Sequence, residues 1–269
     1  MSFKIGFALN SDTETDTRST TKEPETILPR KCLADIYFPS RHITCTYYND
    51  LFNLNIGDAV YVNGKLEGLT GRVVGINYNF KIKLSDYKRV ISLVDTNVKG
   101  KFYFSPSHLI STDSSALPFE KISTWFYPPL KEEDEFVSSF DDTEFHLDTL
   151  SEFKVTESVA QKGWQYYNEN KVVYIEISRK KGRAIVNGSK YYTVEFEYSD
   201  GLIKNLVCDC YCSFNCKHEF ATMLQLKETL EHLKKHYDFI DTSDYFCTIA
   251  KNEFFEFVAA PQQTGSMIL

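Results

Sequence analysis

The sequence predicts an α+β protein of two domains: a small N-terminal β-barrel, and a C-terminal domain in which a helix, antiparallel strands and a second helix surround a cluster of cysteines. Three observations lead to this expectation. Short β-branched and aromatic runs separated by turn residues fill the first part of the chain, and such runs are typical of small barrels and sandwiches. An acidic segment that opens with two prolines interrupts the middle of the chain. The stretch CDCYCSFNCKH then lies between a strand pattern and a helix pattern.

Composition places the chain among ordinary globular proteins. Its 269 residues are enough for two domains, and 42% of them are hydrophobic. The net charge of −7 argues against a protein that coats nucleic acid over its whole surface, although a local basic patch can still bind phosphate. The first residues lack a signal-peptide pattern, and no apolar run approaches the roughly 20 residues of a membrane span. We therefore expect an intracellular, cytoplasmic protein without membrane contact.

The N-terminal part divides into an arm and a barrel. Residues 1–30, polar for most of their length and rich in threonine and acidic side chains, predict a flexible arm. Residues 31–127 contain the runs IYFP, ITCTYY, DAVYV, GRVVGI, FKIKL, VISLV and KFYF, with turn signals such as Asn63-Gly64 between them. This texture predicts the small β-barrel domain.

The stretch ADIYFPSRHITCTYYNDLFNLNIGDAVYVNGKLEGLTGRVVGI resembles the DNA-binding N-terminal barrel of the bacterial primosomal replication-restart helicase, mainly through IGDAVYV and GRVVGI. The resemblance implies a barrel that contacts DNA. Lysine and arginine outnumber acidic residues between positions 56 and 110, which suits such a surface. The alternative is a generic small barrel used for protein contacts.

The rest of the chain divides into a linker, a second domain and a tail. Residues 128–153 carry concentrated acidic charge and predict a linker at the domain boundary. Residues 154–240 open with Thr156 as a candidate N-cap, and continue with the strand patterns VVYIEI, YYTVEFEY and LIKNLVC and the helix pattern HEFATMLQLKETLEHLKKHY. Residues 241–269 add one apolar segment, and their end is expected to be disordered.

The cysteine cluster predicts a zinc site. Structural zinc takes four thiolate or imidazole ligands, and the pairs Cys208-x-Cys210 and Cys216-x-His218 supply them. Residues two apart on an extended segment face the same side, so both sulfurs of the first pair can reach one ion. Cys212 is a fifth candidate that could replace Cys210, but it leaves only a three-residue gap before Cys216. Unligated buried thiols are the remaining alternative.

Cys-x-Cys, a short gap and Cys-x-His resemble the SWIM zinc finger, and the likeness extends over residues 156–228 through GWQYYNENKVVYIEI, AIVNGSKYYTVEFEY and LVCDCYCSFNCKHEFATMLQLK. The position after the second ligand, often proline in that family, is a tyrosine here. The resemblance implies that Cys208, Cys210, Cys216 and His218 hold one structural zinc ion. It also implies a role in DNA transactions or protein contacts, because SWIM domains occur in Swi/Snf-type helicases, some transposases and stand-alone proteins.

Basic residues in the second domain suggest a phosphate contact. Arg179, Lys180, Lys181 and Arg183 lie in SRKKGR, which we expect to form a hairpin turn, and a solvated turn without a ligand is the alternative.

We hypothesise a non-enzymatic DNA- or protein-recognition module, accessory to a DNA-processing enzyme, with DNA or such an enzyme as partner. The competing hypothesis is a protein-interaction adaptor that binds no nucleic acid. A zinc hydrolase that uses Glu219 is a third hypothesis, and it is disfavoured because four protein ligands leave no open position on the metal ion.

Two further groups have a structural and a functional interpretation. Trp164, Tyr166 and Tyr167 could stack on bases, but aromatic side chains at helical spacing beside a sheet are more typical of a core. His232 and His236 are four residues apart on a predicted helix and could share a metal ion, yet they are more typical of a surface stripe.

Overall fold

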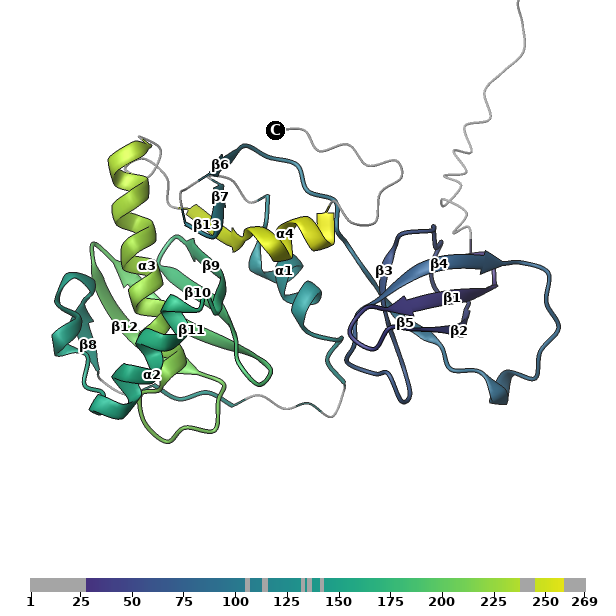
Figure 1. The fold of residues 1–269 in the computed structure, drawn as a ribbon, viewed down its shortest axis with the longest axis horizontal. Coiled ribbons are helices and arrows are strands. Elements are labelled where there is room, and N and C mark those ends of the chain that lie inside the picture. The colour runs from purple at the N-terminus through teal and green to yellow at the C-terminus, as the bar shows by residue number, and fades with distance from the viewer. Residues whose placement is uncertain are drawn as a thin grey trace, which may run out of the picture.

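The computed structural model describes residues 28–104, 107–112, 116–131, 134, 137–140, 143–237 and 245–258. The predicted flexible arm, except for its last three residues, and the predicted disordered end lie outside the described residues. The described chain is α+β, which confirms the predicted class, with two antiparallel sheets and few helices (Figure 1). Within these ranges, no helix is both long and apolar enough to cross a membrane.

The first sheet has five strands, whose order across the sheet is β2-β1-β4-β3-β5. They are β1 (Cys32–Phe38), β2 (Ile43–Asn49), β3 (Ala59–Val62), β4 (Gly71–Asn77) and β5 (Val90–Val94). A short 3₁₀ turn, Leu84–Asp86, lies between β4 and β5. The N–H of Tyr48 donates to the carbonyl of Lys88 at 2.9 Å, and Tyr48 forms a bridge with Arg89. The two outer strands, β2 and β5, therefore approach each other at one end.

The second sheet has eight strands in the order β6-β7-β13-β9-β10-β11-β12-β8. They are β6 (Phe102–Phe104), β7 (Leu109–Thr112), β8 (Glu144–His146), β9 (Val172–Ser178), β10 (Lys181–Asn187), β11 (Tyr191–Ser199), β12 (Leu202–Cys208) and β13 (Tyr245–Ala250). The α-helices are α1 (Phe119–Phe126), α2 (Glu157–Asn168), α3 (Lys217–His236) and α4 (Lys251–Val258). A 3₁₀ segment, Leu147–Glu152, follows β8.

The division between the sheets differs from the predicted domain boundaries. Strands β6 and β7 lie within residues 31–127, predicted as a barrel, yet they belong to the second sheet because β7 pairs with β13. Thr112 lies opposite Cys247 in this ladder. Strand β13 comes from the predicted C-terminal segment 241–269, and β8 comes from the predicted linker 128–153. Long-range backbone pairing therefore joins strands from four predicted segments in one sheet.

Helices α2 and α3 pack against each other beside the second sheet (Figure 1). Thr156 caps α2, as predicted, because its hydroxyl accepts a hydrogen bond from the N–H of Val159 at 3.3 Å. Gly163 of α2 lies against Phe220 of α3, where an added Cβ would be 2.6 Å from a ring carbon. The absence of a side chain at Gly163 thus permits the close approach of the two helices.

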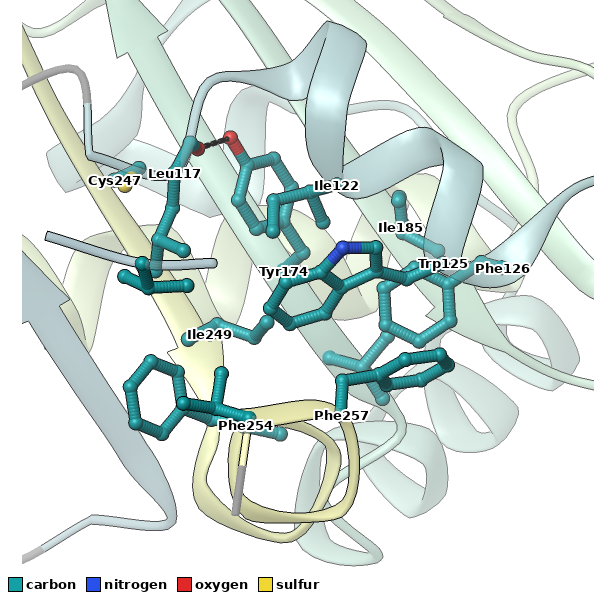
Figure 2. Close-up of a cluster of buried hydrophobic side chains, with 14 of the residues drawn as sticks. Leu117, Ile122, Trp125, Phe126, Tyr174, Ile185, Cys247, Ile249, Phe254 and Phe257 are labelled. Carbon is teal, nitrogen blue, oxygen red and sulfur yellow. Dashed lines mark hydrogen bonds between the residues drawn. The ribbon is translucent and has the colours of Figure 1, made fainter. Parts of the chain in front are cut away.

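An aromatic cluster joins the first sheet, α1, α4 and the second sheet. Figure 2 shows Trp125 and Phe257, whose rings stack with centroids 4.9 Å apart. In the same view the hydroxyl of Tyr174 donates to the carbonyl of Leu117 at 2.7 Å. Tyr61 of the first sheet belongs to this cluster, and its hydroxyl donates to the carbonyl of Trp125 at 3.3 Å. The two sheets therefore share a buried core.

Candidate metal centre

The four predicted ligands converge where the second sheet meets α3. Cys208 is the last residue of β12, Cys210 lies in the turn that follows, and Cys216 and His218 stand at the start of α3. Their ligand atoms, three sulfurs and one imidazole nitrogen, all lie within 4.8 Å of one another. The described structure therefore brings together a group that could hold a metal ion.

The spacing of these atoms fits tetrahedral coordination. Zn–S bonds of about 2.3 Å and Zn–N bonds of about 2.0 Å give S···N edges of about 3.5 Å in a tetrahedron. Nδ1 of His218 lies 3.6 Å from the sulfur of Cys208 and 3.7 Å from the sulfur of Cys216. Three thiols and one imidazole are also a donor set typical of structural zinc. The residues present therefore fit the predicted ion.

Packing against aromatic rings orients the imidazole of His218. Its ring stacks on Tyr192 with centroids 4.2 Å apart and meets the ring of Tyr166 edge-on at 5.4 Å. An added Cβ at Gly188 would lie 2.8 Å from the Tyr192 ring and 3.4 Å from Nε2 of His218. Nε2 is buried without a hydrogen-bond partner among the described residues. The rings of Tyr192 and Tyr166 therefore hold the imidazole with its Nδ1 toward the three sulfurs.

Cys216 also caps the helix that carries His218. Its sulfur accepts a hydrogen bond from the N–H of Glu219 at 3.5 Å, and the Glu219 carboxylate accepts from the N–H of Cys216 at 2.7 Å. This reciprocal pair is a capping box, which satisfies two backbone donors that a helix start leaves without partners. Glu219 is buried and engaged in the helix start, so its position is explained without a role in hydrolysis.

The surroundings of the three thiols shift their pKa values in different directions. The Cys208 thiol donates a hydrogen bond to Cys216, which lowers the pKa of Cys216 and raises the pKa of Cys208. A hydrogen bond with His218 lowers the pKa of Cys216 further. Burial raises the pKa of Cys210 to about 12. Because a metal ion binds cysteine as thiolate, metal binding at this cluster would release protons.

Cys212, the fifth candidate ligand, lies outside the converging group. It is exposed, whereas Cys216 is buried and Cys208 and Cys210 are partly buried. The chain between the ligand pairs presents two aromatic side chains to solvent: Tyr211 is 97% exposed and Phe214 is 88% exposed. The spacing of the cysteines does not predict the exposure of these two rings.

Three of the four predicted phosphate contacts lie at the tip of the β9–β10 hairpin. Arg179 occupies a left-handed backbone conformation, with φ of 58°, and both it and Lys180 are exposed. Lys181 forms an open ion pair with Glu195 at 3.7 Å, in which both side chains remain substantially exposed. These three cations are accessible to an anionic partner.

Arg183 departs from the prediction. Its side chain is only 13% exposed, and its guanidinium donates to the Glu176 carboxylate from Nε at 3.2 Å and from Nη2 at 2.8 Å. Nη1 donates to Glu120 of α1 at 2.8 Å. The Glu176 side chain is 2% exposed and also accepts a hydrogen bond from the N–H of Phe119. Arg183 thus neutralises a buried carboxylate, because a buried charge is costly without a partner.

The remaining candidates take different positions. Trp164 is 48% exposed on α2, whereas Tyr166 packs on the His218 ring and Tyr167 lies edge-on to Trp164 with centroids 5.8 Å apart. The rings of His232 and His236 lie 4.6 Å apart on α3. Within the described ranges, these two histidines are not part of any cluster of three or more metal-ligating residues.

Comparisons of this chain with protein-family models, with curated proteins and with solved structures found no match. The metal-centre geometry and the accessible basic residues therefore carry the functional argument.

Proposed function

We propose that Cys208, Cys210, Cys216 and His218 hold one structural zinc ion, and that the protein is a non-catalytic, SWIM-type recognition module accessory to a DNA-processing enzyme. The observation that carries this proposal is the convergence of the four ligand atoms within 4.8 Å at the junction of β12 and α3. The order of α2, strands β9 to β12, the two ligand pairs and α3 agrees with the arrangement that the resemblance implies.

A structural role follows from the number and position of the ligands. Four protein ligands complete a tetrahedral shell and leave no open position for substrate or activated water. The ion would link the end of a strand to the first turn of the helix that packs on α2, so its binding energy contributes directly to folding. Glu219, the nearest candidate for a general base, is held by the backbone of Cys216.

DNA is the first candidate partner because accessible cations occur in both halves of the molecule. In the second sheet they are Arg179, Lys180 and Lys181. In the first half, Lys81 and Lys83 are exposed in the β4–β5 connection. The approach of β2 to β5 supports the proposal that this sheet closes into the small barrel implied by the sequence resemblance. Such cations bind phosphates through a salt-dependent, sequence-independent attraction.

Zinc content and folding test the metal proposal. Purified protein is expected to contain one zinc per chain, and the variants Cys208→Ser and His218→Ala are expected to lose zinc together with the folding of the second sheet and α3. Inductively coupled plasma mass spectrometry measures the metal, and circular dichroism measures the fold. Zinc-free wild-type protein that is nevertheless fully folded would contradict a structural ion.

Titration of labelled duplex DNA at two salt concentrations tests the DNA proposal. We expect binding that weakens with salt, and an Arg179→Ala/Lys180→Ala/Lys181→Ala variant that binds more weakly. The slope of log affinity against log salt should fall in magnitude by up to about 3, at about 0.9 per lost phosphate contact. The matched control is Lys234→Ala/Lys235→Ala, at the opposite end of α3 from the metal ligands. Unchanged affinity in the triple variant would remove the hairpin from the DNA contact.

A protein-interaction adaptor is the second candidate, supported by the predicted acidic linker. Among its described residues, Leu130, Val137 and Phe140 are 71%, 87% and 51% exposed. Exposed apolar side chains within an acidic stretch suit a basic protein partner. Zinc-loaded wild-type protein that binds no DNA at either salt concentration would favour the adaptor over the DNA module.

A further inference from the structure

The loop between the two ligand pairs, Tyr211–Asn215, presents aromatic rings to solvent. We call it the metal loop. Tyr211 and Phe214 are 97% and 88% exposed, the two most exposed aromatic side chains among the large hydrophobic residues that the structure describes. Rings that bury so little area contribute little to folding. Their presence on this loop therefore points to a role other than stability.

The metal loop is anchored at both of its ends. Cys210 and Cys216 belong to the converging ligand group, and the side chain of Asn215 donates to the carbonyl of Lys154 at 3.0 Å. A short loop tied in this way loses little conformational freedom when it contacts a partner. The two rings are therefore presented on a support that the bound metal would stiffen.

Positive charge borders the metal loop. Nζ of Lys190 lies 5.8 Å from the Tyr211 ring centroid and 5.3 Å from that of Tyr192. Lys217 follows Cys216 at the end of the metal loop, and its Nζ lies 4.4 Å from the ring centroid of Tyr166. In the described part of the chain, neither ammonium group lies within ion-pair distance of a carboxylate. Both charges can therefore attract an anionic chain that passes over the rings.

We infer that the metal loop is a stacking platform for the unpaired bases of a single-stranded nucleic acid, with Tyr211 and Phe214 against base faces and with Lys190 and Lys217 near the phosphates. Proteins that hold single strands combine exposed aromatic rings with flanking cations in this way. A duplex cannot use the rings, because its bases are already stacked on one another. This inference rests on the proposed DNA function and adds a preference for strands with unpaired bases.

The surroundings of the metal loop favour a nucleic acid over a protein partner. A protein contact typically anchors its aromatic side chains in an apolar or grooved patch. Two cavities in the described part of the chain, of about 120 and 360 Å³, are lined by other segments, around His232 and around His108. The charged side chains beside the metal loop are Lys190, Lys217 and Asp209, and the excess of positive charge among them complements a phosphate backbone.

The test compares ring removal on two probes. Zinc-loaded full-length protein is titrated with a labelled oligothymidine of about 12 nucleotides and with a duplex of the same length. The variant Tyr211→Ala/Phe214→Ala is expected to bind the single strand at least about 5-fold more weakly than wild type, and to bind the duplex as wild type does. The slope of log affinity against log salt should be the same for this variant as for the wild type, because no charge is removed. Tyr211→Trp/Phe214→Trp keeps two rings and is expected to retain affinity.

Controls separate this inference from loss of folding and from failure of the wider proposal. Phe140→Ala removes an exposed ring from the predicted linker and is expected to change neither the single-strand affinity nor the duplex affinity. The zinc content verifies that each variant is folded. Equal single-strand affinity of wild type and the double alanine variant would overturn the inference, and so would an equal loss on the duplex. Wild-type binding to the duplex alone would overturn only the stacking platform. Wild-type binding to neither probe would overturn the DNA proposal as well.

Discussion

Removal of the Arg183 charge is expected to be among the most destabilising single changes in the second sheet. Arg183 donates two hydrogen bonds to Glu176, whose side chain is 2% exposed. In Arg183→Met the carboxylate remains buried and keeps the hydrogen bond from the N–H of Phe119, but it loses its charged partner. Breaking one side of a buried ion pair costs about 3–5 kcal/mol. The Glu120 contact adds little, because the Glu120 side chain is 72% exposed and an exposed pair contributes about 0–1 kcal/mol.

Urea unfolding followed by the fluorescence of buried Trp125 measures the effect. Glu120→Gln is the matched control and is expected to lose no more than about 1 kcal/mol. The double variant Arg183→Met/Glu176→Leu is expected to recover most of the loss, because it removes both charges together. A loss below about 1 kcal/mol in Arg183→Met, or a double variant less stable than either single one, would refute the assignment of Arg183 to the buried carboxylate.

Three further predictions concern packing, pH and the ligand set. Gly163→Ala should reduce the free energy of unfolding by about 1–3 kcal/mol, because the new Cβ would meet the ring of Phe220. An unchanged urea midpoint would count against the close contact between α2 and α3. Burial lowers the pKa of His108 from its ordinary value of 6.5, so the unfolded chain binds the proton more readily, and the free energy of unfolding should fall as pH drops below about 6.5. In His108→Asn the urea midpoint should depend less on pH in this range. The same pH dependence in the variant and the wild type would contradict the prediction. Cys212→Ser should retain zinc whereas Cys210→Ser should lose it, and the reverse metal content would show that Cys212 is the ligand.

The local patterns of the sequence predicted the α+β class and the elements around the metal centre. Strand alternation, the Thr156 cap and the helical spacing after His218 are signals between residues close in the chain. The spacing of Cys208, Cys210, Cys216 and His218 likewise needs only a strand end, a short turn and a helix start. Because these relations are local, the structure brings the four ligands together as their spacing indicated.

Long-range pairing explains where the observed sheets differ from the segments expected from the sequence. Strands β6 and β7 are three and four residues long, and their place in the second sheet depends on β13, more than 130 residues later. The apolar segment YFCTIAKNEFFEFV divides into β13 and α4, a boundary that periodicity did not indicate. The basic neighbours of Arg183 in the sequence favour a phosphate contact, whereas its side chain binds Glu176. A signal for its actual partner was present, since Glu176 interrupts the apolar run VVYIEI and lies opposite Arg183 across the hairpin.

X-ray absorption spectroscopy at the zinc edge of the purified protein tests the central claim most directly. A closed structural site predicts three sulfurs at about 2.3 Å and one nitrogen at about 2.0 Å around each ion. A first shell dominated by oxygen and nitrogen, or one with fewer than three sulfurs, would contradict the assignment of Cys208, Cys210, Cys216 and His218 as a complete ligand set.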